Sequence, residues 1–188
     1  MNLVLGSGSP RRRELLAALG LAFEVRVREV DESPIEREDA QVMVARLAQA
    51  KLEAVMELSP DATVLAADTV VIVDGDVLGK PQSPEEGRAM LRRLAGRSHQ
   101  VTTAVALGRG GQVLEVERTT TEVVFRPLTE AAIESYVAFG EGEDKAGGYG
   151  IQGRAGAFVI EIRGSYSNVV GLPMAQTWLL LERHGALP

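Results

Sequence analysis

Residues 3–16, which read LVLGSGSPRRRELL, set the first elements of the fold. An apolar run breaks into alternating glycine and serine, and a proline and three arginines then open a helical pattern. This order predicts a strand, a tight loop and a helix start. Glycines admit close backbone approach, the N–H groups of a helix N-terminus attract anions, and arginines add paired donors. We interpret the loop as a phosphate site with Ser7, Arg11 and Arg12 as candidate ligand-binding residues; the alternative is an ordinary solvated helix start.

The composition limits the classes of function. The chain has 188 residues, no cysteine and two histidines, His99 and His184, which excludes disulfides, thiolate chemistry and a histidine-rich metal site. The length suits a single domain across residues 1–188. A net charge of −6 argues against binding of polymeric nucleic acid. A local arginine cluster in an acidic protein instead favours a small phosphorylated ligand.

No apolar stretch reaches the length of a membrane span, and residues 1–20 contain no apolar signal region. We therefore expect a protein without membrane association, located in the cytoplasm.

Two adjacent acidic residues follow the second predicted strand of the chain. Asp31 and Glu32 precede a serine and a proline in a loop after the alternating strand pattern of residues 23–27. Such acids are commonly solvated turn residues. Their place at a strand end also makes them candidate ligands of a hard cation, which prefers carboxylate oxygens.

Residues 39–58 predict a long amphipathic helix with Asp39 as its cap. We place Met43, Leu47, Ala50, Ala54 and Leu58 on its core-facing stripe. Lys51 lies beside that stripe, in an otherwise apolar row. A lysine there either extends to solvent or reaches an anion.

Asp68 gives the sharpest signal. It stands with Thr69 between two apolar, β-rich runs, residues 63–67 and 70–73. A carboxylate in such surroundings requires protonation, a cation or a salt bridge, and perturbed acids concentrate at functional sites. The alternative is a structural carboxylate.

A two-residue hairpin turn at residues 74–75 then leads to Lys80, held between a glycine and a proline.

The second half of the chain contains another glycine-rich loop, residues 144–153. Its four glycines around one aromatic and one amide favour close approach to a flat ligand, with Gln152 reading donors and acceptors on a base edge. A flexible surface loop is the alternative. Further strands are predicted at residues 100–107, 112–125 and 158–162, and helices at 14–19, 83–96, 129–140 and 173–184. Arg88, Arg92 and Arg93 of the second of these helices are predicted to form a solvated face.

Several of these pieces together resemble the Maf family of nucleoside triphosphate pyrophosphatases. They occur in the family's order over nearly the whole chain: residues 7–12, 67–69, 79–81, 144–153, 164–166 and 171–173. The resemblance implies a mixed α/β fold similar to that of inosine triphosphate pyrophosphatases, with an elongated mixed central β-sheet flanked by helices and two lobes around a cleft. It also implies hydrolysis of a nucleoside triphosphate to the monophosphate and pyrophosphate, with a divalent cation, Mg²⁺ or Mn²⁺.

The resemblance also assigns roles by position. Asp68 matches the catalytic acid, described as the proton acceptor. Glu32, Lys51 and Lys80 match charged active-site positions, and we expect Asp68 and Glu32 to hold the metal. Ser7 belongs to the phosphate-binding loop, together with the arginines that follow it.

The branch within the family depends on three positions. Members similar to the dTTP/UTP branch carry arginine at position 11, threonine at 69 and glutamine at 152, as this chain does. The branch that prefers 7-methyl-GTP has tryptophan, glutamine and glutamate there. We therefore expect dTTP and UTP as substrates, or modified pyrimidine nucleotides in a house-cleaning role. The alternative is a nucleotide-binding regulator of septum formation that acts through a protein partner. The apolar ends of several strands favour a homodimer.

Overall fold

The computed structural model describes residues 2–187 and divides the chain into two compact units. Unit 1 consists of Met1–Asp68, Thr103–Thr119 and Gly171–Pro188. Unit 2 consists of Thr69–Thr102 and Thr120–Val170.

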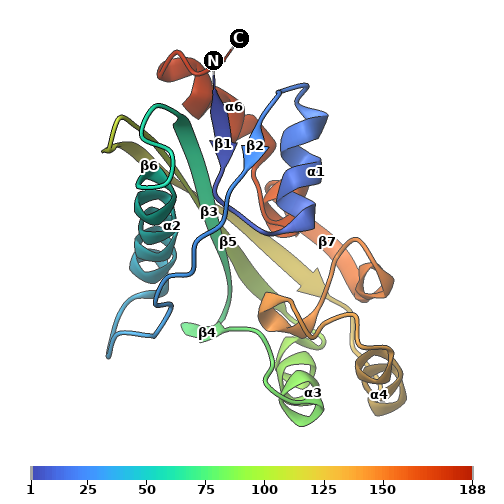
Figure 1. Ribbon diagram of the computed structural model, residues 1–188. Helices are drawn as coiled ribbons and strands as arrows, with labels where there is room; N and C mark the ends of the chain where they lie inside the picture. The colour runs from blue at the N-terminus through green and yellow to red at the C-terminus, as the bar shows by residue number, and fades with distance from the viewer. Residues whose placement is uncertain (1, 188) are drawn as a thin grey trace. The chain divides into compact units, whose positions relative to one another are not determined.

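One mixed β-sheet runs through the chain in the strand order β2-β1-β3-β5-β6-β7, with β4 paired to β3. The strands are β1 (Leu3–Leu5), β2 (Glu24–Val25), β3 (Thr63–Val73), β4 (Asp76–Leu78), β5 (Ser98–Arg109), β6 (Gln112–Phe125) and β7 (Val159–Arg163). The pairs β1–β2 and β1–β3 are parallel, whereas β3–β4 and β6–β7 are antiparallel. The helices are α1 (Pro10–Ala18), α2 (Ala40–Met56), α3 (Pro84–Leu94), α4 (Glu130–Phe139), α5 (Tyr166–Val170) and α6 (Met174–Arg183) (Figure 1). The predicted mixed α/β architecture is confirmed.

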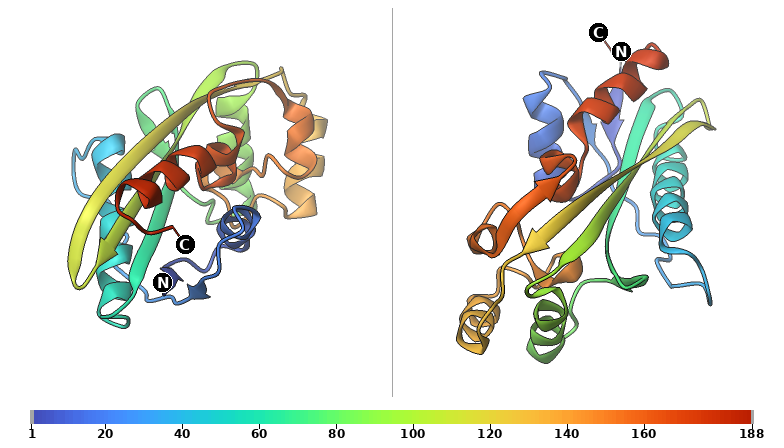
Figure 2. Two further views of the ribbon diagram at one scale, coloured as in Figure 1. Left: turned by 90° about the horizontal axis from the view of Figure 1, so that it is seen from above. Right: turned by 180° about the vertical axis from the view of Figure 1, so that it is seen from behind.

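Unit 1 packs helices on both faces of its part of the sheet. Buried side chains of α1 and α6 join those of β1, β3 and β5 in one apolar cluster, which includes Leu5, Leu16, Leu65, Leu107 and Leu181. The helix α2 lies on the other face of these strands from α6 (Figures 1 and 2). This arrangement gives successive residues of β3 two different surroundings, because their side chains alternate between the faces.

Unit 2 has an apolar cluster of its own. It joins β3, β4, the N-terminal part of β5 and the C-terminal part of β6 to α3, α4 and the glycine-rich loop, through residues that include Val71, Leu91, Val101, Phe125, Ile133 and Tyr149. The hairpin between β3 and β4 turns at Asp74 and Gly75, whose φ angles of 55° and 84° are those of the predicted two-residue turn.

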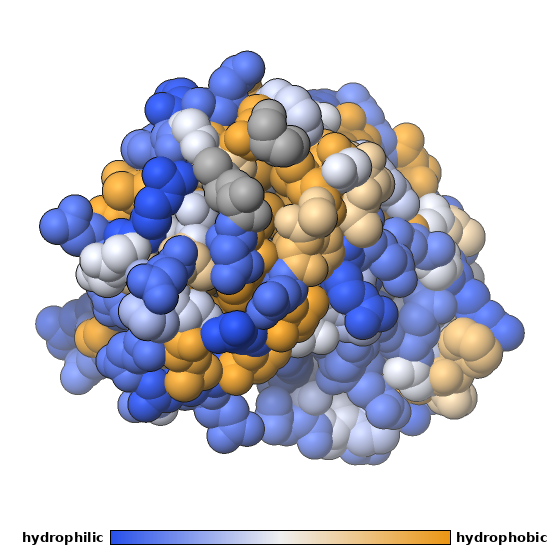
Figure 3. Space-filling model, turned by 45° about the horizontal axis from the view of Figure 1, so that its top comes forward, coloured by the Kyte–Doolittle hydropathy of each residue, from blue (hydrophilic) through white to orange (hydrophobic). Residues whose placement is uncertain are grey.

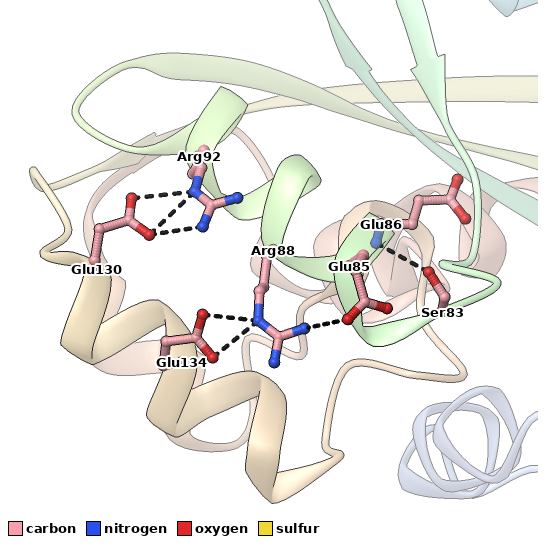
Figure 4. Close-up of polar contacts among 7 residues, drawn as sticks. All are labelled: Ser83, Glu85, Glu86, Arg88, Arg92, Glu130 and Glu134. Carbon is pink, nitrogen blue, oxygen red and sulfur yellow. Dashed lines mark hydrogen bonds and ion pairs between the residues drawn. The ribbon is translucent and has the colours of Figure 1, made fainter.

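The helices α3 and α4 are also joined by ion pairs (Figure 4). Arg88 donates from Nε to Glu134 at 2.8 Å, and Arg92 donates from Nη2 to Glu130 at 2.7 Å. Arg93 pairs with Asp76 at 2.8 Å. The predicted solvated face holds for Arg92 and Arg93, whose side chains are 48% and 40% exposed, and the structure adds acidic partners that the prediction did not include. Because these pairs lie at the surface, each contributes little to the stability of the protein.

The helix predicted at residues 39–58 is confirmed, with Asp39 accepting hydrogen bonds from the N–H groups of Gln41 and Val42. Its core-facing stripe was predicted wrongly in part. Leu47 is buried, but Leu58 lies beyond the helix and is 46% exposed. The buried row is instead the one that contains Lys51, together with Val44, Ala48 and Val55. The reason is that two neighbouring apolar rows satisfied the helical period, and packing on the sheet selected one of them.

Hydrophilic residues cover most of the face shown in Figure 3, with apolar residues gathered between them. Exposed large apolar side chains of the described residues include Val25, Val27, Ile160, Tyr166, Trp178 and Leu179. Within residues 2–187, no helix combines the length and apolar character that crossing a membrane requires. The predicted homodimer stays a prediction.

Candidate active site

Asp68 and Lys51 form an ion pair within unit 1. Asp68 lies in β3, next to Ala67, which faces the cluster of α1 and α6. Because side chains alternate along a strand, Asp68 points to the opposite face, where α2 lies. Lys51 Nζ donates to Asp68 Oδ1 at 2.6 Å, and the two side chains are only 18% and 12% exposed. Of the neutralising partners predicted for Asp68, a salt bridge is the one present.

Lys51 reaches this carboxylate because it belongs to the buried row of α2. Val44 and Ala48 precede it on that row and Val55 follows it, and none of the three is more than 1% exposed. The lysine is the polar member of a row that faces the sheet. It therefore contacts an anion rather than extending to solvent.

Glu32 is the second carboxylate on the same ammonium group. Its Oε1 lies 2.9 Å from Lys51 Nζ, and its side chain is 55% exposed. The neighbouring Asp31 has a different role: its Oδ1 accepts from the N–H of Ser33 at 2.9 Å, and hydrogen bonds from the side chain and then the backbone of Ser33 lower the pKa of Asp31. The two acids of this loop therefore differ: Glu32 contacts Lys51 at the candidate site, and Asp31 stabilises the local turn.

The glycine–serine loop connects β1 to α1 as the sequence predicts. Ser9 caps α1, accepting from the Arg12 N–H, and Pro10 occupies the first turn. The cap aligns the free N–H groups and the positive end of a nine-residue helix with the loop. Ser7 is buried, and its hydroxyl accepts from the N–H of Ser9 at 3.3 Å.

Arg12 fixes the loop to a distant part of unit 1. Its Nη1 donates to Ser7 Oγ at 3.2 Å, and its Nε donates to Gly171 O at 2.8 Å. Gly171 has a φ of 129°, a conformation that favours glycine. The sequence reasoning gave no role to the Gly171 carbonyl, although Gly171 lies in one of the motifs that carry the resemblance. Arg11, beside Arg12 at the start of the helix, is half-buried.

Electrostatics link this loop to the carboxylates. Desolvation lowers the pKa of Arg12, and the charges of Asp68 and Glu32 oppose that shift. Within unit 1, cationic groups from the loop and from α2 therefore interact electrostatically with two carboxylates. Such an arrangement can hold a polyphosphate through its cations and act on it through its acids.

The same order of loop, acid and lysine positions occurs in a known family. The model of the Maf-like proteins matches residues 2–184. The chain belongs to the Maf family. It is 52% identical to a protein named dTTP/UTP pyrophosphatase of Anaeromyxobacter dehalogenans over 97% of this chain and 94% of that protein. It is 50% identical to proteins of the same name in Shigella sonnei and Escherichia coli O157:H7, over 99% of this chain and 94% of each relative.

A solved structure supports the fold separately. The HAM1 protein of Coxiella burnetii matches 97% of this chain and 99% of its own, with a TM-score of 0.55 and 14% sequence identity. The likeness concerns the fold alone. That residues 1–188 make up a single domain stays a prediction.

The other positions of the Maf pattern belong to unit 2. Thr69 directly follows Asp68 in β3 and is half-buried. Lys80 follows β4 and is exposed, and its carbonyl accepts from Gln82 Nε2 at 3.0 Å. Gln152 is exposed in the glycine-rich loop. The structure thus joins Ser7, Arg12, Glu32, Lys51 and Asp68 by contacts or charge within unit 1. The functional roles of these residues stay predictions, as do those of Arg11, Thr69, Lys80 and Gln152.

The donor set fits a hard divalent cation that is held partly by substrate. Within residues 2–187 no group of three or more histidine, aspartate or glutamate side chains could enclose a metal. Asp68 and Glu32 nevertheless converge on one point, at Lys51 Nζ. Mg²⁺ is commonly bound through one or two carboxylates together with substrate phosphates and water. Asp68 and Glu32 are the residues that would hold it.

Proposed function

We propose that this protein hydrolyses dTTP and UTP to the nucleoside monophosphate and pyrophosphate, with Mg²⁺ or Mn²⁺ as cofactor. The observation that carries the proposal is the pairing of Asp68, in an apolar strand, with Lys51. A protein that only bound nucleotides would have little need for a costly carboxylate at this position. The substrates are those named for relatives about half identical to this chain.

The chemistry assigns a task to each side chain. Asp68 accepts a proton from the attacking water. The oxygen of that water bonds to phosphorus, and the phosphoanhydride bond between the α and β phosphates breaks. Lys51 holds the Asp68 carboxylate in place through their 2.6 Å ion pair, and its charge also offsets that of the phosphates. Arg11 and Lys80 offset the negative charge that moves to the leaving pyrophosphate. When bound, the cation polarises the phosphate oxygens and neutralises part of their charge.

The loop residues hold the substrate. The Ser7 hydroxyl and the N-terminus of α1 offer donors to phosphate oxygens, and Arg12 fixes Ser7 in place. Thr69 and Gln152 select the pyrimidine base. As a neutral amide, Gln152 can both donate to and accept from the edge of uracil or thymine.

The test is pyrophosphate release from a panel of canonical and modified nucleoside triphosphates, with Mg²⁺, with Mn²⁺ and after chelation. Wild type is compared with Asp68→Asn and with Asp61→Asn, the same change at an exposed position of unit 1. We expect dTTP and UTP turnover that requires the cation, falls by about 10²–10⁴ in Asp68→Asn and persists in Asp61→Asn. Nucleotide binding without any turnover would refute the enzyme and favour the regulator of septum formation. Faster turnover of a modified nucleotide would assign the house-cleaning role.

We also propose that the enzyme acts in the cytoplasm, where its proposed substrates are made and used. The exposed side chains of Trp178 and Leu179 on α6 support a homodimer. Light scattering during size-exclusion chromatography distinguishes a 20.1 kDa monomer from a dimer.

A further inference from the structure

The segment that carries Gln152 is a tight turn within unit 2. The N–H of Gly153 donates to the carbonyl of Gly150 at 3.1 Å, so Ile151 and Gln152 occupy the two central positions of the turn. Gln152 is exposed there. Its position depends on what holds the two ends of the turn.

Both ends are held by Glu141, which follows α4. Glu141 Oε2 accepts from the N–H of Arg154 at 3.0 Å, directly after the turn. Glu141 Oε1 accepts from the Tyr136 hydroxyl at 3.1 Å, and this hydroxyl accepts from the N–H of Gly150 at 3.0 Å. One carboxylate therefore fixes the last part of the turn directly and the first part through Tyr136.

The glycines of the turn permit this contact. A Cβ atom on Gly153 would lie 2.3 Å from the carboxylate atoms of Glu141, and one on Gly150 would lie 2.7 Å from Cε of Lys145. Lys145 Nζ donates in turn to the Glu141 carbonyl at 2.6 Å. A side chain at position 153 or 150 would displace the end of Glu141 or Lys145, so the two glycines leave room for the Glu141 carboxylate beside the turn.

The hydroxyl in this chain of contacts stays protonated. Burial raises the pKa of Tyr136, and the nearby charge of Glu141 raises it further. The phenol can therefore donate to Glu141 throughout the neutral range while it accepts from Gly150.

We propose that Glu141 is a positioning residue for base selectivity: its carboxylate clamps the turn of residues 150–153 and so sets the place from which Gln152 meets the base. The inference rests on the proposed function, which assigns base recognition to Gln152. It adds a residue that does not touch the nucleotide and acts through the backbone of the turn.

The first test measures selectivity with the full chain. Glu141→Gln and Tyr136→Phe each remove part of the clamp, and Glu143→Gln is a matched control, because Glu143 is exposed two residues away. We expect the ratio of kcat/KM for UTP to that for GTP to fall about tenfold in the first two variants, the equivalent of one lost hydrogen bond. In a Gln152→Ala background the same changes should alter the ratio little, because the clamp acts through Gln152.

The second test measures the turn without nucleotide. Amide hydrogen exchange of Gly150 and Arg154, followed by NMR, should accelerate in Glu141→Gln and not in Glu143→Gln. Faster exchange with an unchanged UTP-to-GTP ratio, or an equal loss of activity on every nucleotide, would overturn the inference and leave the proposed function intact. A wild type without preference for UTP would instead refute the base selectivity of the proposed function, while the exchange of Gly150 and Arg154 would still show whether Glu141 holds the turn.

Discussion

Lys51 and Asp68 form the central contact of unit 1, with Nζ 2.6 Å from Oδ1. One partner comes from the buried row of α2 and the other from the face of β3 that α2 covers. Breaking such a contact leaves a largely desolvated charge without its partner, so the cost of losing one side chain exceeds the net contribution of the pair. Under the proposed function, stability and catalysis are therefore coupled at this position.

Replacing Lys51 tests that coupling. Lys51→Met retains most of the volume of the side chain and removes its charge, leaving Asp68 among apolar residues. We expect the free energy of unfolding to fall by about 3 kcal/mol, and pyrophosphate release to fall more than tenfold. Urea unfolding measures the first effect. The double variant with Asp68→Asn should lose less stability than the sum of the two single variants, and strict additivity would contradict the pairing.

Arg12 joins the phosphate loop to Gly171 through two different donors, Nε and Nη1. Arg12→Lys keeps the charge, but all donors of a lysine lie on one nitrogen atom. They cannot replace the planar guanidinium, which donates in two directions at once. We expect KM for UTP to rise about tenfold, with a loss of about 1 kcal/mol in the free energy of unfolding. Arg13→Lys, a change at the exposed neighbouring position, is the control. An equal effect of both variants on KM would show that only the net charge of the loop matters.

His99 makes the stability of the protein depend on pH. It is 3% exposed, and burial lowers its pKa from 6.5 to about 4. The unfolded chain therefore binds a proton between about pH 6.5 and pH 4 that the folded protein does not, so stability falls as the pH falls through this window. The loss is on the order of 3 kcal/mol. Urea unfolding at several pH values should show a flatter dependence in His99→Gln, and parallel curves for the two proteins would exclude His99 as the cause.

The amide of Gln152 is expected to decide the choice of base. Gln152→Glu replaces a group that donates and accepts by one that only accepts, and we expect the UTP-to-GTP ratio of kcat/KM to fall about tenfold. Gln112→Glu introduces the same charge at another exposed position and is the control. An unchanged nucleotide profile in Gln152→Glu would remove Gln152 from base recognition.

Local patterns in the sequence were sufficient for much of the fold. The caps of α1, α2 and α4 lie at Ser9, Asp39 and Thr129, and each side chain accepts from the helix it starts. The turn at Asp74 and Gly75 follows in the same way from backbone preferences. These features depend on residues within one turn of each other, so their signals lie in short stretches of the chain.

The sequence by itself determined that Asp68 needed a partner, because its neighbours in the strand are apolar. It did not determine which partner, since two rows of α2 satisfied the same helical period and only packing on the sheet turned the row of Lys51 inward. The arginines of α3 were likewise recognisable as charged but not as the partners of Glu130 and Glu134 on α4. Glu141 carried no sequence signal for its contact with Gly153, because a contact between residues twelve positions apart depends on how the chain folds back. Local preferences fix what each segment forms, whereas long-range packing decides which side chains meet.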